Sequence, residues 1–157
     1  DLGNIYFERG DYEKAIPYYE KAVELDPNNA IYHANLRGSF RALGQWDEAI
    51  KKYELTIEKA IKTNPNDKIF HKYLSLVYND RGIELYNKQE DDKAIEDYKK
   101  AIELNNNDPI IYYNLYLVYY AKGMNNEAKE TINKAIALSP DNQTFSQALN
   151  TLMSKGI

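Results

Sequence analysis

The sequence contains no cysteine, which excludes disulfide bonds and thiolate metal sites and leaves the redox compartment undecided. It also lacks any apolar run approaching the roughly 20 residues that a membrane-spanning helix needs, and its mean hydropathy is −0.70. No signal-peptide pattern opens the chain. From these absences we expect a cytoplasmic protein without membrane insertion.

An excess of basic charge is also missing. The chain has 20 Lys and Arg against 24 Asp and Glu, with the two signs interspersed rather than in blocks. A nucleic-acid surface needs a basic patch, so we expect no nucleic-acid partner. What the chain does have is 157 residues, 43% of them hydrophobic, and 15 Tyr. That is the length of one domain with enough apolar residues for a continuous core.

The stretch 10–29 has the pattern of one amphipathic helix between two turns. Ala15 and Ala22 lie seven residues apart and so fall on one face of the helix. Apolar residues recur beside them at i, i+3 and i+7, namely at Ile16, Tyr19 and Val23. Pro27 ends the helix, because the residue before proline disfavours helical backbone.

This pattern recurs along the chain. Each copy has an alanine near the start of an apolar helix, and these alanines are Ala15, Ala49, Ala94 and Ala128. The spacings between them are 34, 45 and 34 residues. The residue five positions earlier is a turn glycine in three copies and a glutamine in one, at Gly10, Gly44, Gly123 and Gln89. A fixed period of this size predicts a stacked solenoid of helix pairs.

The 45-residue spacing contains eleven residues more than the others. Apolar periodicity continues through them without glycine, so we expect the second helix of one unit to be four residues longer and the first helix of the next to be about seven residues longer. These two helices would form a hairpin that projects from one edge, around a loop at 64–67. The alternative is an irregular loop.

The expected units are about 1–29, 30–67, 68–108 and 109–142, followed by a capping helix at 143–153, all within a single domain, 1–157. The chain begins inside a helix and without Met, so we expect it to be part of a longer protein.

The full pattern resembles the tetratricopeptide repeat. Its 34-residue unit carries an aromatic, Leu-Gly and Tyr in the first helix and Ala, an aromatic and Ala in the second, with Pro near the end. The clearest matches in the last unit are Tyr112, Leu115, Tyr119, Ala128, Ala135 and Pro140, with Tyr116 in place of the Gly. Other units match at Tyr78, Gly82, Leu85, Ala94, Tyr98 and Ala101, and at Leu2, Gly3, Tyr6, Ala15, Tyr19, Ala22 and Pro27. We expect Leu2, Gly3 and Tyr6 to face inward. The resemblance implies an all-α fold, a right-handed α-solenoid of antiparallel helix pairs.

The family mostly binds proteins or peptides, so the resemblance implies a protein-interaction module whose concave groove is lined by the first helices. The residues turned to that groove combine amides with aromatics, and the candidates are Asn4, Phe7, Asn35, Arg41, Asn79, Ile83, Tyr86, Tyr113, Asn114, Leu117 and Tyr120. An asparagine amide both donates and accepts, so it can pair with an extended peptide backbone in either polarity. Some of these asparagines could instead serve only local structure. The alternative function is a structural or self-assembling scaffold, including a homo-oligomer, that makes contacts through its edges or the hairpin near 56–75.

One subtype of the family clamps the acidic C-terminal tail of heat-shock chaperones with Lys, Asn and Arg on successive first helices. Asn4 and Asn35 match its two asparagine positions. The first Lys would precede Asp1, and the third helix carries Leu76 and Asp80 where Lys and Arg are required. The Asp80 carboxylate would repel a carboxylate ligand. A chaperone C-terminal tail is therefore not the expected partner.

No motif for chemistry is found. The sequence has no Gly-rich phosphate loop and no nucleophile elbow. Its two histidines, His33 and His71, lie far apart in sequence and lack a ligand partner at i+4. Each falls four residues into a first helix, where the repeat places a packing aromatic. We therefore expect both to be packing residues, and we expect no enzyme activity, no cofactor and no metal.

Overall fold

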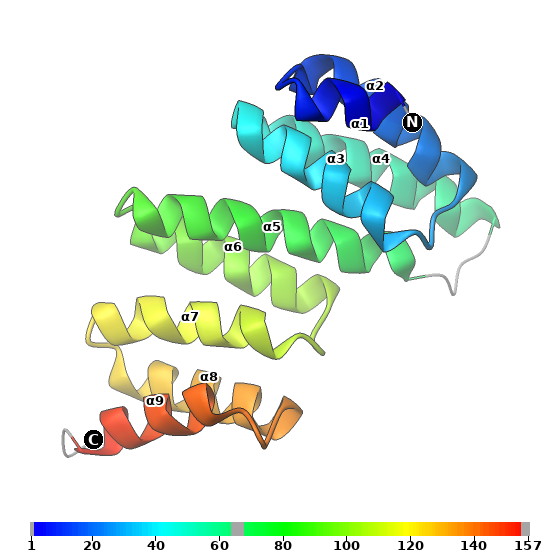
Figure 1. The fold of residues 1–157 in the computed structure, drawn as a ribbon. Coiled ribbons are helices and arrows are strands. Elements are labelled where there is room, and N and C mark those ends of the chain that lie inside the picture. The colour runs from blue at the N-terminus through cyan, green and yellow to red at the C-terminus, as the bar shows by residue number, and fades with distance from the viewer. Residues whose placement is uncertain (1, 64–67, 155–157) are drawn as a thin grey trace. The chain divides into compact units, whose positions relative to one another are not determined.

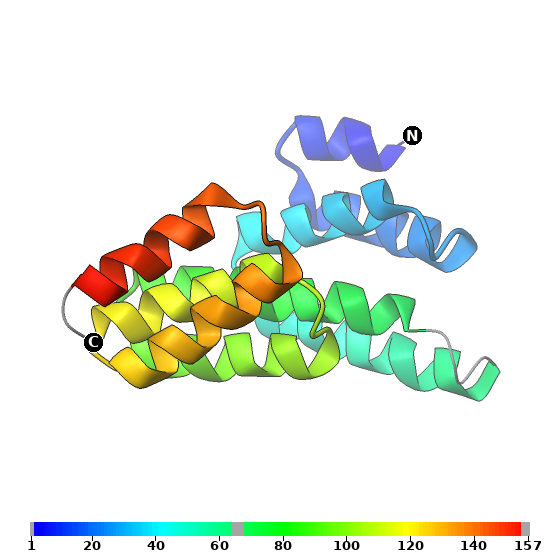
Figure 2. The same cartoon turned by 90° about the horizontal axis from the view of Figure 1, so that it is seen from below.

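The computed structural model describes residues 2–63 and 68–154, and these residues form nine α-helices (Figures 1 and 2). In chain order the helices are α1 (Leu2–Glu8), α2 (Tyr12–Leu25), α3 (Ala30–Leu43), α4 (Trp46–Thr63), α5 (Ile69–Asn87), α6 (Asp91–Leu104), α7 (Pro109–Ala121), α8 (Asn125–Leu138) and α9 (Gln143–Ser154). The two helices of each pair, α1 with α2, α3 with α4, α5 with α6 and α7 with α8, run antiparallel across a short turn. The predicted all-α helical repeat is confirmed.

The chain divides into two compact units, which are described separately. Unit 1 is Asp1–Val77 and unit 2 is Tyr78–Ile157, so α5 contributes its first half to one and its second half to the other. Within the described ranges, no helix is both long enough and apolar enough to cross a membrane.

The turn between the two helices of a pair has the same geometry four times. At Gly44 the backbone φ is 66°, the Gly44 N–H donates to the Arg41 carbonyl at 3.1 Å, and the next N–H donates to the Phe40 carbonyl at 3.0 Å. This is a Schellman motif, which satisfies the last carbonyls of the helix and needs one left-handed residue. Gly10 and Gly123 adopt the same conformation, with φ of 80° and 71°. So does Gln89, with φ of 62°, as its place in the repeat indicates.

Nine of the eleven extra residues lengthen two helices, α4 by the expected four and α5 by five relative to α3 instead of the expected seven. Helix α4 has 18 residues, four more than the 14 of α2, α6 and α8. Helix α5 has 19 residues, against 14 in α3 and 13 in α7. The helical interpretation is confirmed over the irregular loop, and the predicted loop at 64–67 lies outside the described residues.

The extension at the start of α5 does not project freely, which corrects part of the hairpin prediction. Phe70 and Tyr73 lie in the added turns, yet they are only 6% and 4% exposed. The Tyr73 ring stacks on His33 of α3 with a centroid distance of 3.4 Å, and Phe70 meets the same imidazole edge-on. The extra turns therefore add to the core of unit 1.

Close approach of α1 to α2 explains the glycine of the repeat. A Cβ placed on Gly3 would lie 3.0 Å from the Tyr19 ring, and Tyr19 is 1% exposed. In unit 2 the same approach is tighter, since a Cβ on Gly82 would lie 2.9 Å from the Tyr98 ring. Leu2, beside Gly3, is 53% exposed, so the expectation that it faces inward is wrong.

In the pair α7 and α8 the large residue lies on the first helix and the smaller residue lies on the second. Tyr116 stands where the repeat has glycine, and Ile132 stands where Tyr19 and Tyr98 stand in the other pairs. Both are buried, at 3% and 0% exposure. A large residue on the first helix is thus matched by a smaller one on the second, as close packing requires.

Candidate functional site

The predicted groove residues fall on the first helices of the pairs, in two sets. In unit 1 they lie on α1 and α3 and form what we call the α1–α3 face, made of Asn4, Phe7, Asn35 and Arg41. In unit 2 they lie on the second half of α5 and on α7 and form the α5–α7 face, made of Asn79, Ile83, Tyr86, Tyr113, Asn114, Leu117 and Tyr120.

On the α1–α3 face an amide pair joins the two helices. The Asn4 side-chain oxygen accepts from the Tyr19 hydroxyl at 2.9 Å and from the Asn35 side-chain amide at 3.3 Å. Burial, and then the charge of Glu8, raise the pKa of Tyr19, so its hydroxyl stays protonated and can donate. The side-chain oxygen of Asn35 is left to accept a hydrogen bond, and the side-chain nitrogen of Asn4 is left to donate one.

Phe7 gives this face its apolar surface. Its ring packs edge-on against Tyr12 and Tyr19, with centroid distances of 5.2 and 6.2 Å. It also lies over Gly38 of α3, where an added Cβ would be 3.4 Å from the ring. Phe7 is half-buried, and Arg41 in the last turn of α3 is exposed. The face therefore combines an aromatic surface, two amides and one guanidinium.

The α5–α7 face repeats the amide pair in a more buried form. The Asn114 amide nitrogen donates to the Asn79 side-chain oxygen at 2.8 Å. Asn79 is only 7% exposed, whereas Asn114 is half-buried. Asn79 therefore holds Asn114 in place instead of facing solvent. Sequence reasoning treated these asparagines one by one and missed the pairing, although their recurrence on successive first helices was a signal for it.

A row of tyrosines lies beside Asn114 along α7. Tyr113 and Tyr120 each lie near Tyr116, with ring centroids 5.8 and 5.7 Å apart, and Tyr113 also packs on Phe145 of α9 at 5.2 Å. Tyr116 and Phe145 are buried, while Tyr113 and Tyr120 are half-buried. Burial is the main reason that the pKa of Tyr116 is raised. The contact between Phe145 and Tyr113 was not predicted from the sequence.

The remaining predicted residues surround this row. Ile83 is 39% exposed, and Tyr86 and Leu117 are half-buried. Aromatic and aliphatic groups in this state are held by their neighbours and still present area to a ligand, as residues that anchor partners do. The α5–α7 face can therefore offer apolar contact beside a fixed amide.

His33 is a buried packing residue, as expected. Its Nε2 lies 2.9 Å from the Pro27 carbonyl, which can only accept, so Nε2 carries the proton and donates. Its Nδ1 then accepts from the Tyr53 hydroxyl at 2.9 Å. Burial is the main reason that the pKa of His33 is lowered to about 4. His71 is half-buried, and across the described residues no cluster of His, Asp and Glu is arranged to hold a metal.

Comparison with protein-family models gives four matches along the chain. Models described as "Tetratricopeptide repeat" match residues 1–29, 33–68 and 110–142, and a model described as "TPR repeat" matches residues 82–123. All four describe helical repeats. Three of the matches each cover one helix pair, α1 with α2, α3 with α4 and α7 with α8, whereas the match to 82–123 runs from the second half of α5 through α7.

The chain is similar to several repeat proteins. It is 39% identical over 51 residues to the Hsp70-Hsp90 organising protein of Plasmodium falciparum, a match that covers 32% of this chain and 20% of that protein. It is 32% identical over 97 residues to the small glutamine-rich tetratricopeptide repeat-containing protein 2 of Saccharomyces cerevisiae, covering 62% and 25%. The chain therefore spans no more than a quarter of either relative. A crystal structure of MamA matches 99% of this chain and 85% of its own with 25% identity and a TM-score of 0.56.

Proposed function

The chain belongs to the tetratricopeptide repeat family, and from this premise we propose that it binds an extended segment of a partner protein on the first helices of its pairs. The repeat matches and the relatives support a protein–protein interaction module. The α1–α3 and α5–α7 faces are the surfaces that we assign to the ligand.

The observation that carries the proposal is the amide held beside aromatic rings on the α5–α7 face. Asn114 uses one amide proton on Asn79 and keeps its carbonyl oxygen and one N–H for a ligand. Because Asn79 fixes it, the amide loses little freedom on binding a peptide backbone. Tyr113 and Tyr120 add contact area at low entropic cost. One amide pair contributes only about 1 kcal/mol net, so affinity requires several contacts.

The α1–α3 face offers the same combination with a charge added. Asn35 is held by Asn4, and Phe7 lies between Tyr12 and Gly38. The exposed Arg41 guanidinium suits a carboxylate in the partner. We infer that a segment bound here carries an acidic residue near its apolar one.

An unstructured peptide selected from a random display library by this chain provides the probe. We expect Asn114→Ala or Asn35→Ala to weaken that peptide about tenfold, since each removes an amide contact and frees its neighbour. The matched control is Asn133→Ala, on the exposed side of α8, which leaves affinity unchanged. Unchanged affinity in both test variants, with intact circular dichroism, would overturn the proposal.

The name of the Plasmodium relative couples it to Hsp70 and Hsp90. A chaperone tail nevertheless stays outside our proposal, because Leu76 and Asp80 on α5 replace the cations that the clamping subtype uses. We expect the C-terminal peptide of Hsp90 to bind poorly, and the same peptide with an amidated C-terminus to bind equally poorly. Tighter binding of the free carboxylate would show that the clamp exists.

The second candidate function is self-assembly through the extended helices near 56–75. Leu55, the residue before that stretch, is 52% exposed, which favours a contact there. Against it, Phe70 and Tyr73 are already buried within unit 1. Sedimentation would show a concentration-dependent dimer that is lost when Leu55 is changed to Asp. The cytoplasmic location stays a prediction.

A further inference from the structure

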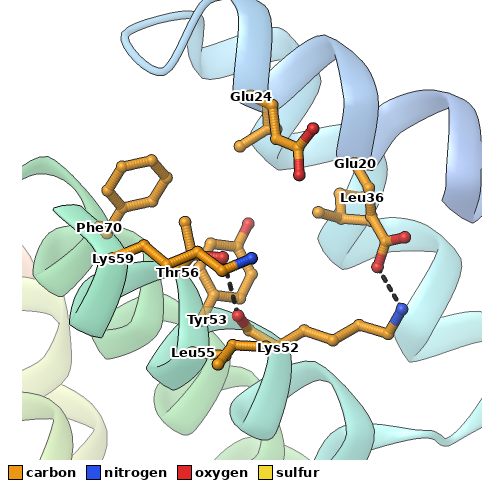
Figure 3. A pocket seen from close by; sticks show the side chains of 10 residues that line it. Glu20, Glu24, Leu36, Lys52, Tyr53, Leu55, Thr56, Lys59 and Phe70 are labelled. Carbon is orange, nitrogen blue, oxygen red and sulfur yellow. Dashed lines mark hydrogen bonds and ion pairs between the residues drawn. The ribbon is translucent and has the colours of Figure 1, made fainter.

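A cavity of about 180 Å³ lies between α2 and α4 in unit 1, among residues that belong to neither of the faces proposed above. Its apolar lining comes from three helices besides α2 and is largely buried. The buried side chains that supply it are Val23, Leu36, Tyr53 and Phe70. Leu55 of α4, which is 52% exposed, also lines the cavity (Figure 3). The cavity is therefore a site distinct from the first-helix faces.

Charged residues of opposite sign face each other across the opening. Helix α2 contributes Glu20 and Glu24, one turn apart, and α4 contributes Lys52 and Lys59. Lys52 forms an ion pair with Glu20, which bridges the two helices. Glu24 and Lys59 are exposed, and neither is paired with another residue in the described part of the chain. Figure 3 shows both side chains around the same opening, so one anion and one cation flank an apolar cavity.

The cavity arises where unit 1 departs from the repeat. Thr56 of α4 occupies the place that Ala22, Ala101 and Ala135 occupy in the other second helices. Its hydroxyl donates to the Lys52 carbonyl at 2.9 Å and is satisfied within the helix. Phe70 comes from the added turns of α5. The lengthened spacing thus supplies part of the wall, and the cavity is particular to this pair of helices.

The size of the cavity limits what can occupy it. Pockets for whole small-molecule ligands usually have volumes of about 300–1,000 Å³, whereas an engineered apolar cavity of about 150 Å³ holds one benzene. A volume of about 180 Å³ therefore suits one aromatic or branched side chain. Single buried side chains of this kind are the usual anchors of protein interfaces.

We propose that this cavity receives one Phe or Leu side chain of a partner protein, flanked by a basic residue that pairs with Glu24 and an acidic residue that pairs with Lys59. The apolar lining binds the anchor, and the two unpaired charges fix the direction of the partner chain. Charge complementarity of this type sets orientation more than affinity.

Two acetylated and amidated peptides, Lys-Gly-Phe-Gly-Glu and Glu-Gly-Phe-Gly-Lys, test the proposal because they present the flanking charges in opposite orders. Titration at millimolar concentration is followed through the backbone amide signals of the isotopically labelled chain. We expect one order to bind more tightly, with shifts centred on Val23, Leu55 and Thr56. The tighter-binding peptide, with Ala in place of its Phe, should bind at least about tenfold more weakly.

Two variants complete the test. Thr56→Leu fills the cavity and should abolish the shifts. The double change Glu24→Lys with Lys59→Glu conserves net charge and should reverse the preferred peptide order, and it decides the matter if Thr56→Leu fails to fold. Asn114→Ala, in the other unit, should leave this binding unchanged, so the outcome is separate from that of the first-helix faces. Absence of binding, equal binding of the Ala peptide, or the same preferred order after the charge reversal would each overturn the proposal.

Discussion

The two units make the same hydrogen bond with different chemistry. In unit 1, His33 of α3 donates to the carbonyl of Pro27, six residues earlier. In unit 2, Tyr112 holds the corresponding place on α7, and its hydroxyl donates to the carbonyl of Asn106, also six residues earlier, at 3.3 Å. The imidazole is fully buried and titrates in mild acid, whereas burial raises the pKa of the phenol, which stays neutral. Of these two hydrogen bonds, only the one that His33 makes in unit 1 is therefore sensitive to mild acid.

The largest predicted effect is the loss of stability of unit 1 in acid. The pKa of His33 falls from about 6.5 in the unfolded chain to about 4 in the folded one, so the unfolded state binds the extra proton first. The stabilising contribution of the neutral imidazole is complete above pH 6.5 and is lost as the pH falls toward 4. We expect roughly 3 kcal/mol of lost stability by pH 4. Amide hydrogen exchange measures the loss for each unit separately.

His33→Gln is the matched control for this prediction. A glutamine amide can still donate to the Pro27 carbonyl but does not titrate in this range. The variant will be less stable near neutral pH because it loses the stack on Tyr73. Its stability should nevertheless change less than that of the unmodified chain between pH 6.5 and 4. An equal pH dependence in both proteins would refute the assignment to His33.

The ion pairs of the two units give the second contrast. In unit 2, Arg81 binds Asp97 through two bonds of 2.7 Å, and the Asp97 side chain is 7% exposed. In unit 1, Glu20 and Lys52 form a more exposed pair, with side chains 29% and 38% exposed. Removing one partner of a buried pair leaves a poorly solvated charge, whereas exposed pairs contribute little.

We therefore expect Asp97→Ala to destabilise the chain by about 2 kcal/mol, below the full cost for a buried pair because Arg81 still reaches water. Glu20→Ala should cost less than about 1 kcal/mol. Urea unfolding of both variants measures the difference. Equal losses would show that burial does not distinguish the two pairs.

The sequence was sufficient for features that depend on spacing along one chain. The four-residue lengthening of α4 and the left-handed place of Gln89 both follow from counting against the repeat. Periodicity indicates which side of a helix faces inward, but it does not identify the atom that each side chain meets. The bond from Asn114 to Asn79 and the ion pair between Arg81 and Asp97 therefore had to come from the structure.

The cavity in unit 1 shows the same limit. In the sequence, Thr56 stands where the other second helices carry Ala22, Ala101 and Ala135. The consequence of this difference depends on how α5 packs after its added turns. Those turns were expected to project, whereas Phe70 lines the cavity and Tyr73 covers His33. A departure from the repeat can be located from sequence, but whether it leaves a projection, a filled core or a hole is decided by packing between helices.

A smaller effect than that of Asp97→Ala is predicted for the turns. Gln89 is the one non-glycine residue among the four left-handed turn positions of the described helix pairs. A side chain there costs about 1–2 kcal/mol of backbone strain, partly offset because glycine loses more entropy on folding. We expect Gln89→Gly to stabilise unit 2 by about 1 kcal/mol, measured by thermal unfolding. The reverse change at Gly123, in the same unit, should destabilise it by a similar amount, since a Cβ there meets no neighbour within 4 Å and the backbone conformation alone is changed. If Gly123→Gln is costly and Gln89→Gly gives nothing, then the Gln89 side chain makes a compensating contact, and the two turns of unit 2 differ in more than their residues.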